Sequence, residues 1–419
     1  MRALFFTCIL FPIFLSATLS LDRDIQSECV VLINASTGKV LFAKNPDQPV
    51  YPASTTKIAT AFYALMQKPN GLKEAVIAPK EALITVSPSE KIQANYSKCP
   101  SFWLESDGSH VGIKSGHVLT LEELLYGTMI SSGNDASNII AHHVSGKIQT
   151  FVEDMNRFVK NLGCQNTHFC NPHGLHHPEH ITTARDMARL AQCAMYHPVF
   201  RKAVAMKKYE RQATATQPRL LFVQTNKMLL PGKHYYPEAI GIKTGYTSKA
   251  GHSVVVAAQK GDRTLIAAIY KSKDKDARFY DARALFDACF KEVKVEKLLL
   301  AAGPQAFSQL YDGAESEVQT YTKEPIRLEY YPSEEPEIRS LLTWDFVPLP
   351  IKEGTKVGQI TILADEKEHT IVPLFAKNEV KETLSAKMNR LAHTVVEHWI
   401  IALSLFALVI VGYSLVRRR

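Results

Sequence analysis

"YPASTTKIATAFYAL", residues 51–65, places a serine and a lysine three positions apart at the start of an apolar segment. Side chains at positions i and i+3 lie on one face of a helix, so the Lys57 amine can reach the Ser54 hydroxyl. Apolar residues such as Ile58 and Phe62 predict that this helix buries one face. Serine needs a neighbouring base to become a nucleophile, and burial can lower the pKa of a lysine until its amine is neutral. Taken alone, the pair is better explained as a helix cap with a solvated lysine, so other parts of the chain must decide whether the serine is activated.

The Ser-x-x-Lys spacing occurs elsewhere in the chain, so it is not diagnostic alone. Ser36 and Lys39 fall in the turn of an expected β-hairpin, and Ser272 and Lys275 fall in a charged run. Neither pair has an apolar helix to organise it. The pair within 51–65 stands apart by its context.

Two later segments carry further short motifs. "SSGNDASN" (131–138) follows an expected helix, and "GIKTGYTSKAGHS" (241–253) precedes an expected hairpin. They supply a Ser-x-Asn and a Lys-Thr-Gly motif: Ser132 and Asn134, then Lys243, Thr244 and Gly245.

The two ends of the chain predict export and anchoring. Residues 1–20 have one early positive charge, a short apolar run and small residues at its exit, as in a secretory signal peptide. Residues 399–416 are 18 uncharged, mostly apolar residues. As a helix they would measure about 27 Å, enough to span a bilayer core. Trp399 and Tyr413 sit near its ends as interfacial aromatics do, and the arginines at 417–419 mark the cytoplasmic side.

Hydrophobic patterning divides the exported part into segments. Residues 21–290 have strand pairs at both ends of a helix-rich middle, which predicts an α/β (α+β) domain whose antiparallel sheet is flanked by helices. We expect hairpins over 29–45 and 252–272 and helices over 53–66, 119–130, 151–163, 183–196 and 277–290. Short alternating runs over 291–380 predict a small all-β domain, and 381–398 predicts an amphipathic stalk helix.

Composition excludes some function classes. The net charge of +8 is spread along the chain and partly terminal, so nucleic-acid binding is not indicated. Six cysteines follow the signal segment without paired C-x-x-C spacing. Cys164 and Cys170 are the nearest two in sequence, but disulfide connectivity cannot be read from spacing.

The three motifs in this order resemble those of penicillin-binding proteins and serine β-lactamases. Nearly all of 29–290 looks like the low-molecular-weight D-alanyl-D-alanine carboxypeptidases, of the DacA type. That resemblance implies a β-lactamase/transpeptidase-like domain followed by a β-rich domain, with a membrane-attaching C-terminus. It implies no cofactor, peptidoglycan stem peptides ending in D-Ala-D-Ala as substrate, and β-lactams as covalent inhibitors. The catalytic body would lie on the periplasmic (extracytoplasmic) face of the inner membrane.

The resemblance also implies roles for the motif residues. Ser54 would attack the carbonyl of the terminal D-Ala-D-Ala bond, with Lys57 as its base. Ser132, with Lys243, would pass a proton to the leaving D-alanine, and water would then hydrolyse the acyl-enzyme.

Other motif residues would bind the substrate. Asn134 would bind its amide, Lys243 and Thr244 its terminal carboxylate, and Gly245 would let it lie along the strand. The backbone N–H groups of the nucleophile and of Tyr246 would form the oxyanion hole.

The sequence departs from the family pattern in two places. Tyr246 stands where many relatives have histidine, and we expect only a backbone contact there. A family arginine upstream of Lys-Thr-Gly has no clear counterpart around 223–229.

One segment matches a zinc-binding sequence pattern. In "LHHPEH" (175–180), His176, Glu179 and His180 match the H-x-x-E-H pattern of zinc peptidases. That pattern needs a helix, and Pro178 inside it would cost about 3 kcal/mol there. Three further metal-type ligands lie just upstream: His168, Cys170 and His173. We expect no metal.

Three alternatives stay open. A β-lactamase would need a deacylating glutamate motif between the second and third motifs, and none is recognisable. A D,D-endopeptidase acting on cross-links is compatible with the same motifs. A non-catalytic wall-binding protein is disfavoured because Ser54, Lys57, Ser132 and Lys243 are all present.

Overall fold

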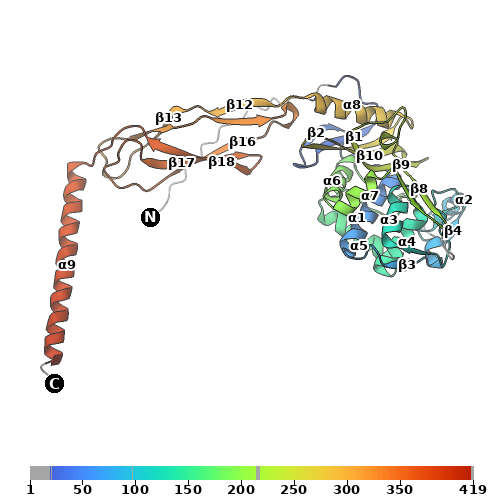
Figure 1. The fold of residues 1–419 in the computed structure, drawn as a ribbon, viewed down its shortest axis with the longest axis horizontal. Helices are drawn as coiled ribbons and strands as arrows, with labels where there is room; N and C mark the ends of the chain where they lie inside the picture. The colour runs from blue at the N-terminus through green and yellow to red at the C-terminus, as the bar shows by residue number, and fades with distance from the viewer. Residues whose placement is uncertain (1–18, 20, 97, 214–217, 417–419) are drawn as a thin grey trace. The chain divides into compact units, whose positions relative to one another are not determined.

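The computed structural model describes residues 19, 21–96, 98–213 and 218–416 (Figure 1). The expected signal peptide at 1–20, apart from Leu19, and the basic tail at 417–419 lie outside the described residues. The chain divides into two compact units, and the division between them falls at Glu292 and Val293.

The first unit is built on a five-stranded antiparallel sheet. Its strand order is β2-β1-β11-β10-β9, so the first two strands of the unit lie beside its last three. The strands are β1 (Cys29–Asn34), β2 (Val40–Lys44), β9 (Ala239–Thr247), β10 (Gly251–Lys260) and β11 (Arg263–Ser272). The expected sheet, made from both ends of the domain, is confirmed.

Both faces of this sheet are covered. Successive side chains of a strand point to opposite faces. Val31 and Ile33 of β1 therefore join the larger core, beneath the helices, whereas Val30 and Leu32 join a second core under helix α8 (Ala277–Lys291). Figure 1 shows α8 on one side of the sheet and the cluster of other helices on the opposite side.

The helical cluster lies between β2 and β9 in the sequence. Its helices are α1 (Lys57–Gln67), α2 (Pro88–Gln93), α3 (Leu121–Met129), α4 (Asn134–Ser145), α5 (Ile148–Asn161), α6 (Ala184–Met195) and α7 (Pro198–Ala205). Short 3₁₀ helices are η1 (Ala53–Thr56), η2 (Lys80–Leu83) and η3 (Lys227–Leu229). Three two-stranded ribbons pair β3 (Ala75–Ile77) with β6 (Val118–Thr120), β4 (Thr85–Val86) with β5 (Leu104–Glu105), and β7 (Lys208–Arg211) with β8 (Leu220–Val223).

Helix boundaries follow the expected capping residues. The Thr120 hydroxyl accepts a hydrogen bond from the Glu123 N–H (3.1 Å), and the Glu123 carboxylate accepts one from the Thr120 N–H (2.9 Å). This capping box satisfies two otherwise free donors at the start of α3. The expected helix over 53–66 differs in one respect, because its first turn is the 3₁₀ helix η1 and α1 begins only at Lys57. Sequence analysis proposed no helix for α4 or α7.

The second unit contains an all-β part and a long helix. A five-stranded sheet has the order β13 (Gly303–Gln309), β14 (Val318–Thr322), β18 (Lys367–Ala376), β17 (Lys356–Ala364) and β16 (Ile338–Trp344). A second pairing joins β12 (Val295–Leu300) to β15 (Ile326–Tyr330), and η4 (Pro332–Glu334) follows. Alternating residues such as Val357 and Leu374 form its separate core. The expected all-β architecture is confirmed.

The stalk and the span expected at 381–398 and 399–416 form one continuous helix, α9 (Leu384–Val416). Within it, Leu384–Leu408 is long and apolar enough to cross a membrane, with a mean hydropathy of 1.6. Its apolar side chains, including Leu403 and Phe406, are exposed.

Candidate active site

Ser54 lies in η1, directly before α1, and its hydroxyl faces the amine at the head of that helix. The Lys57 Nζ is 3.0 Å from the Ser54 Oγ. The same amine donates to the Asn134 Oδ1 at 2.7 Å and to the His173 backbone oxygen at 2.6 Å. All three partners are uncharged, and the hydroxyl can donate as well as accept.

Burial sets the electrostatics of Lys57, which has no exposed surface. Desolvation is the main cause that lowers the pKa of Lys57 well below its usual range, and the Lys243 charge lowers it further. Asp135 opposes this shift. Its buried carboxylate accepts backbone N–H groups from residues 111–113 and does not pair with the lysine. The neutral amine needed for a general base is favoured.

A glycine positions the serine turn. Ala53 has φ +49° and Gly174 has φ +92°. A Cβ on Gly174 would lie 1.9 Å from the Ala53 backbone oxygen, so only glycine allows the two backbones to approach this closely. The Asn171 side chain accepts hydrogen bonds from the N–H groups of Gly174 (2.7 Å) and His173 (3.3 Å), which braces this loop against η1.

The second motif joins α3 to α4. Ser132 has a left-handed backbone, with φ +62°, and is only 6% exposed. Asn134 begins α4, and its N–H donates to the Ser109 oxygen at 2.8 Å. The structure thus joins Asn134 to Lys57 directly and places Ser132 two residues earlier in the same buried loop.

The third motif lies on β9, the edge strand beside η1. Lys243 is fully buried, and its Nζ donates to the Thr244 oxygen at 3.0 Å. Burial, helped by the Arg278 charge, lowers the pKa of Lys243 to about 7. A Cβ on Gly245 would lie 2.9 Å from the Pro52 oxygen, so this glycine lets β9 pack against the serine turn.

The remaining motif residues lie at the open side of β9. The Thr244 hydroxyl donates to the Thr225 Oγ1 at 3.0 Å. Tyr246 is 58% exposed, and its ring stacks on His252 with a centroid distance of 4.4 Å. The Tyr246 side chain therefore points away from the buried lysines, which leaves its backbone as the part available to the site.

Comparison with known proteins places this geometry in a family. Residues 16–274 match a family described as D-alanyl-D-alanine carboxypeptidase, and residues 297–382 match the C-terminal domain of penicillin-binding protein 5. The chain belongs to the D-alanyl-D-alanine carboxypeptidase family. The predicted serine-type D-Ala-D-Ala carboxypeptidase function is thereby confirmed.

Individual relatives agree. The chain is 28% identical to D-alanyl-D-alanine carboxypeptidase DacF of Bacillus subtilis (strain 168), over 85% of this chain and 86% of the relative. It is 28% identical to DacC of Escherichia coli (strain K12), over 86% and 85% of the two chains. The solved DD-transpeptidase of Streptomyces K15 is 29% identical with a TM-score of 0.55, covering 64% of this chain and 98% of that chain. Penicillin binding protein 5 from Haemophilus influenzae, 24% identical, shares the fold with a TM-score of 0.58 over 87% of this chain and all of that chain.

Arg278 is a site residue of this carboxypeptidase that sequence reasoning missed. It extends from α8 through the sheet, and its Nη1 donates to the backbone oxygens of Gly245 (3.0 Å) and Ser253 (2.8 Å). Burial lowers the pKa of Arg278 to about 10, so it keeps its charge at neutral pH. The family arginine was sought upstream of Lys-Thr-Gly, whereas this cation comes from 33 residues beyond Gly245. An arginine on the buried face of a helix is the signal that could have found it.

The H-x-x-E-H segment does not form the zinc site that its sequence pattern suggests. Among the described residues, His176, Glu179 and His180 do not converge as a ligand group. The His180 Nε2 contacts the Thr56 hydroxyl at 2.8 Å, and its Nδ1 accepts the Cys170 N–H at 3.0 Å. Burial lowers the pKa of His180 to about 3, which makes it a neutral structural bridge to the serine turn.

The six cysteines after the signal segment all lie among the described residues, and none of them forms a disulfide there. Cys164 Sγ donates to the Asp186 oxygen, whereas Cys170 Sγ faces His177. The two cysteines nearest in sequence are therefore not paired.

Proposed function

We propose that Ser54 removes the terminal D-alanine of peptidoglycan stem pentapeptides through an acyl-enzyme, with Lys57 as the base. The observation that carries this proposal is the environment of Lys57: a fully buried amine, 3.0 Å from the Ser54 Oγ, whose other hydrogen-bond partners are an amide and a backbone carbonyl. No carboxylate holds its proton, so the amine can accept one from serine.

Acylation begins with transfer of the Ser54 hydroxyl proton to the Lys57 Nζ. The Oγ forms a bond to the carbonyl carbon of the penultimate D-alanine, and the carbonyl oxygen takes the negative charge. The backbone N–H groups of Ser54 and Tyr246 stabilise that oxyanion. The C–N bond then breaks, and Ser132, with Lys243, delivers a proton to the nitrogen of the leaving D-alanine; the proton held by Lys57 replaces the one that Ser132 gives up. Water attacks the ester and frees Ser54.

Substrate binding uses the cations beside β9. Lys243 and Thr244 hold the terminal carboxylate, Asn134 binds the peptide amide, and Gly245 leaves room for the substrate along the strand. The Arg278 guanidinium, fixed on the Gly245 oxygen, adds positive charge behind the carboxylate. β-Lactams, which carry an acylating amide and a carboxylate, acylate the same serine.

The full-length chain in detergent tests this assignment. We expect a penicillin to add its mass once to the wild type and not to Ser54→Ala. A pentapeptide ending in D-Ala-D-Ala should release D-alanine at a rate that also vanishes in Ser54→Ala. An adduct that persists in Ser54→Ala would overturn the assignment. Rapid loss of the adduct would indicate a β-lactamase, and cleavage of cross-linked dimers in place of D-alanine release would indicate an endopeptidase.

We further propose that 1–20 directs export, that 21–290 is the catalytic domain and 291–380 the β-rich domain, and that α9 anchors the protein in the inner membrane. The length and apolar exposure of Leu384–Leu408 support the anchor. Ending the chain before Leu384 should move it from the membrane fraction to the soluble periplasmic fraction. A truncated chain that stays in the membrane would contradict the anchor.

A further inference from the structure

A cluster of metal-type ligands lies on the loop behind the serine turn, away from the catalytic groups. The Cys170 Sγ is 3.3 Å from the His177 Nδ1 and 3.7 Å from the His168 Nδ1. Ligand atoms of Cys170, His177 and Glu179 all lie within 4.8 Å of one another. The proposed catalytic mechanism uses none of these side chains.

These separations suit a tetrahedral metal ion. Zinc binds cysteine sulfur at about 2.3 Å and histidine nitrogen at about 2.0 Å, so two such ligands at a tetrahedral angle stand about 3.5 Å apart. The 3.3 Å between the Cys170 Sγ and the His177 Nδ1 is close to that value.

The tautomer of His177 also suits metal binding. Its Nδ1 accepts the Glu179 N–H at 3.2 Å, so this nitrogen carries a lone pair and no proton. In a neutral imidazole the other ring nitrogen, Nε2, then carries the proton.

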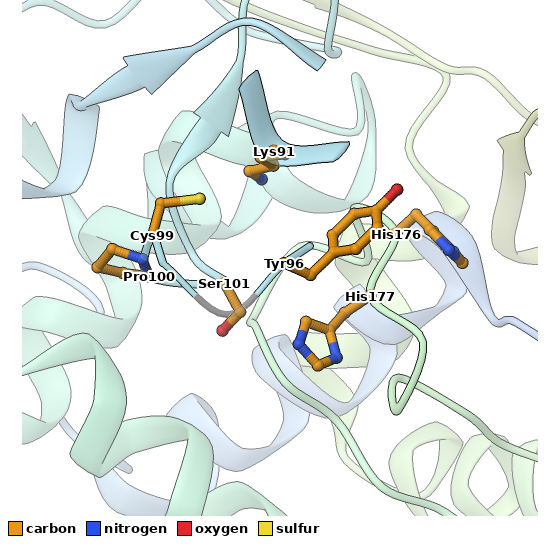
Figure 2. Close-up of a pocket in the computed structure, with 7 residues that line it drawn as sticks. All are labelled: Lys91, Tyr96, Cys99, Pro100, Ser101, His176 and His177. Carbon is orange, nitrogen blue, oxygen red and sulfur yellow. The ribbon is translucent and has the colours of Figure 1, made fainter. Parts of the chain in front are cut away.

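The neighbouring contacts fix the segment that carries these ligands. The His168 Nδ1–H donates to the Glu179 backbone oxygen at 2.9 Å, which holds the far end of the loop beside Cys170. His177 also lines a pocket together with Tyr96 and Cys99 (Figure 2). Figure 2 shows the His176 and His177 rings pointing away from each other. The contact with the Cys170 Sγ is made by the His177 Nδ1.

We propose that Cys170, His177 and Glu179 bind one Zn²⁺-type transition-metal ion, with the fourth position open to water beside His168. Binding breaks the Cys170 S–H bond and releases that proton to the solvent. It also replaces the hydrogen bond from the Glu179 N–H to the His177 Nδ1, so that the thiolate and the Nδ1 lone pair become ligands. No metal was expected from the sequence, either for the H-x-x-E-H pattern, of which this set keeps only Glu179, or for His168, Cys170 and His173, of which it keeps only Cys170.

The site would join the two ends of the loop that supports the catalytic lysine. Cys170 and His177 flank His173, whose oxygen accepts from Lys57, and Gly174, which packs on Ala53. A bound ion would therefore raise the thermal stability of this loop's surroundings without supplying a catalytic group.

Equilibrium dialysis of the reduced, chelator-stripped full-length chain in detergent against Zn²⁺ alone tests the proposal. We expect one ion per chain in the wild type, unchanged after the active site is first blocked with penicillin. Cys170→Ser and His177→Ala should each weaken binding at least about tenfold. Cys99→Ser and His176→Ala, which alter a neighbouring thiol and the adjacent ring, are the matched controls and should bind like the wild type.

Co²⁺ in place of Zn²⁺ should give a thiolate-to-cobalt charge-transfer band that disappears in Cys170→Ser. Formation of the penicillin adduct by each variant reports that it is folded, and His177→Gln replaces any variant that fails this check. Substoichiometric binding by the wild type, or equal losses in Cys170→Ser and Cys99→Ser, would overturn the proposal. Neither outcome bears on the acylation of Ser54, so the metal-site proposal can be wrong while the proposed function holds.

Discussion

The Lys57 Nζ donates to the Asn134 Oδ1 across 2.7 Å, although 77 residues separate the two in the chain. This contact ties the first motif to the second and fills one position around the amine with a neutral amide oxygen. A negative charge at the same place would stabilise the protonated lysine. The identity of residue 134 therefore controls whether Lys57 can act as a base.

Asn134→Asp should raise the pKa of Lys57 and leave the amine protonated at neutral pH. We expect the rate of acylation by penicillin to fall by about 10²-fold there, the usual contribution of a general base, and to recover at alkaline pH. Asn134→Leu removes the amide without adding charge, so its rate should fall without that shift. Superimposable pH profiles for the two variants would contradict the electrostatic role of Asn134.

Lys243 should impose an alkaline limit on turnover. It is charged below a pKa of about 7 and neutral above it, so its hold on the substrate carboxylate weakens as pH rises through that value. The kcat/KM for a D-Ala-D-Ala peptide should therefore fall as the pH rises through that pKa, which gives the pH profile an alkaline limb. Lys243→Arg keeps its charge and should move the limb to higher pH. If the alkaline limb of the Lys243→Arg profile is unchanged, the titration of a group other than Lys243 causes it.

Arg278→Leu removes the positive charge next to β9 and should weaken binding of the substrate carboxylate. Loss of a buried charged hydrogen bond commonly costs about 2 kcal/mol, and we expect the KM for the peptide to rise at least about tenfold. Because the Arg278 charge lowers the pKa of Lys243, the alkaline limb should also move upward in this variant.

Arg283→Leu is the matched control on the same helix. The Arg283 side chain is half-buried and donates to the Tyr235 oxygen. Loss of activity in both variants without a pH shift would indicate a general role for α8 in folding.

Gly174→Ala should displace the serine turn, because its Cβ would meet the Ala53 oxygen. A misplacement of about 1 Å at reacting groups can cost about 10²-fold in rate, and we expect a penicillin acylation rate lowered to that extent.

Gly163→Ala controls for backbone strain. Gly163 has φ +96°, close to the +92° of Gly174, but a Cβ there would meet nothing within 4 Å. Gly163→Ala should lower the stability of the protein and leave the rate of acylation by penicillin unchanged. If both variants acylate normally, the close packing of the 171–175 loop does not position Ser54.

The motif residues could be predicted from sequence because their spacing on a helix start, a loop and an edge strand is local. The partners that tune them could not. Arg278 and Gly174 reach the site from distant segments, and only the folded sheet brings their atoms to Gly245 and Ala53.

Local patterns also left two elements undetermined. η1 was expected as part of the α-helix, since a 3₁₀ turn and an α-helical turn share the same apolar spacing. The change from an amphipathic to a fully apolar pattern near residue 399 predicted two segments, whereas the backbone hydrogen bonds of α9 continue through it. Cys170 was considered as a metal-type ligand, but its pairing with His177 was not predicted because the spacing of the two resembles no familiar motif.

The protonation state of Lys57 is the central claim, and NMR of the full-length chain labelled with carbon-13 at lysine Cε measures it directly. The signal that disappears in Lys57→Arg identifies the residue. We predict that this signal reports a neutral amine at neutral pH, with a pKa well below the usual value of 10.5. A Lys57 signal that stays in the charged position until that ordinary pKa is reached would contradict the account.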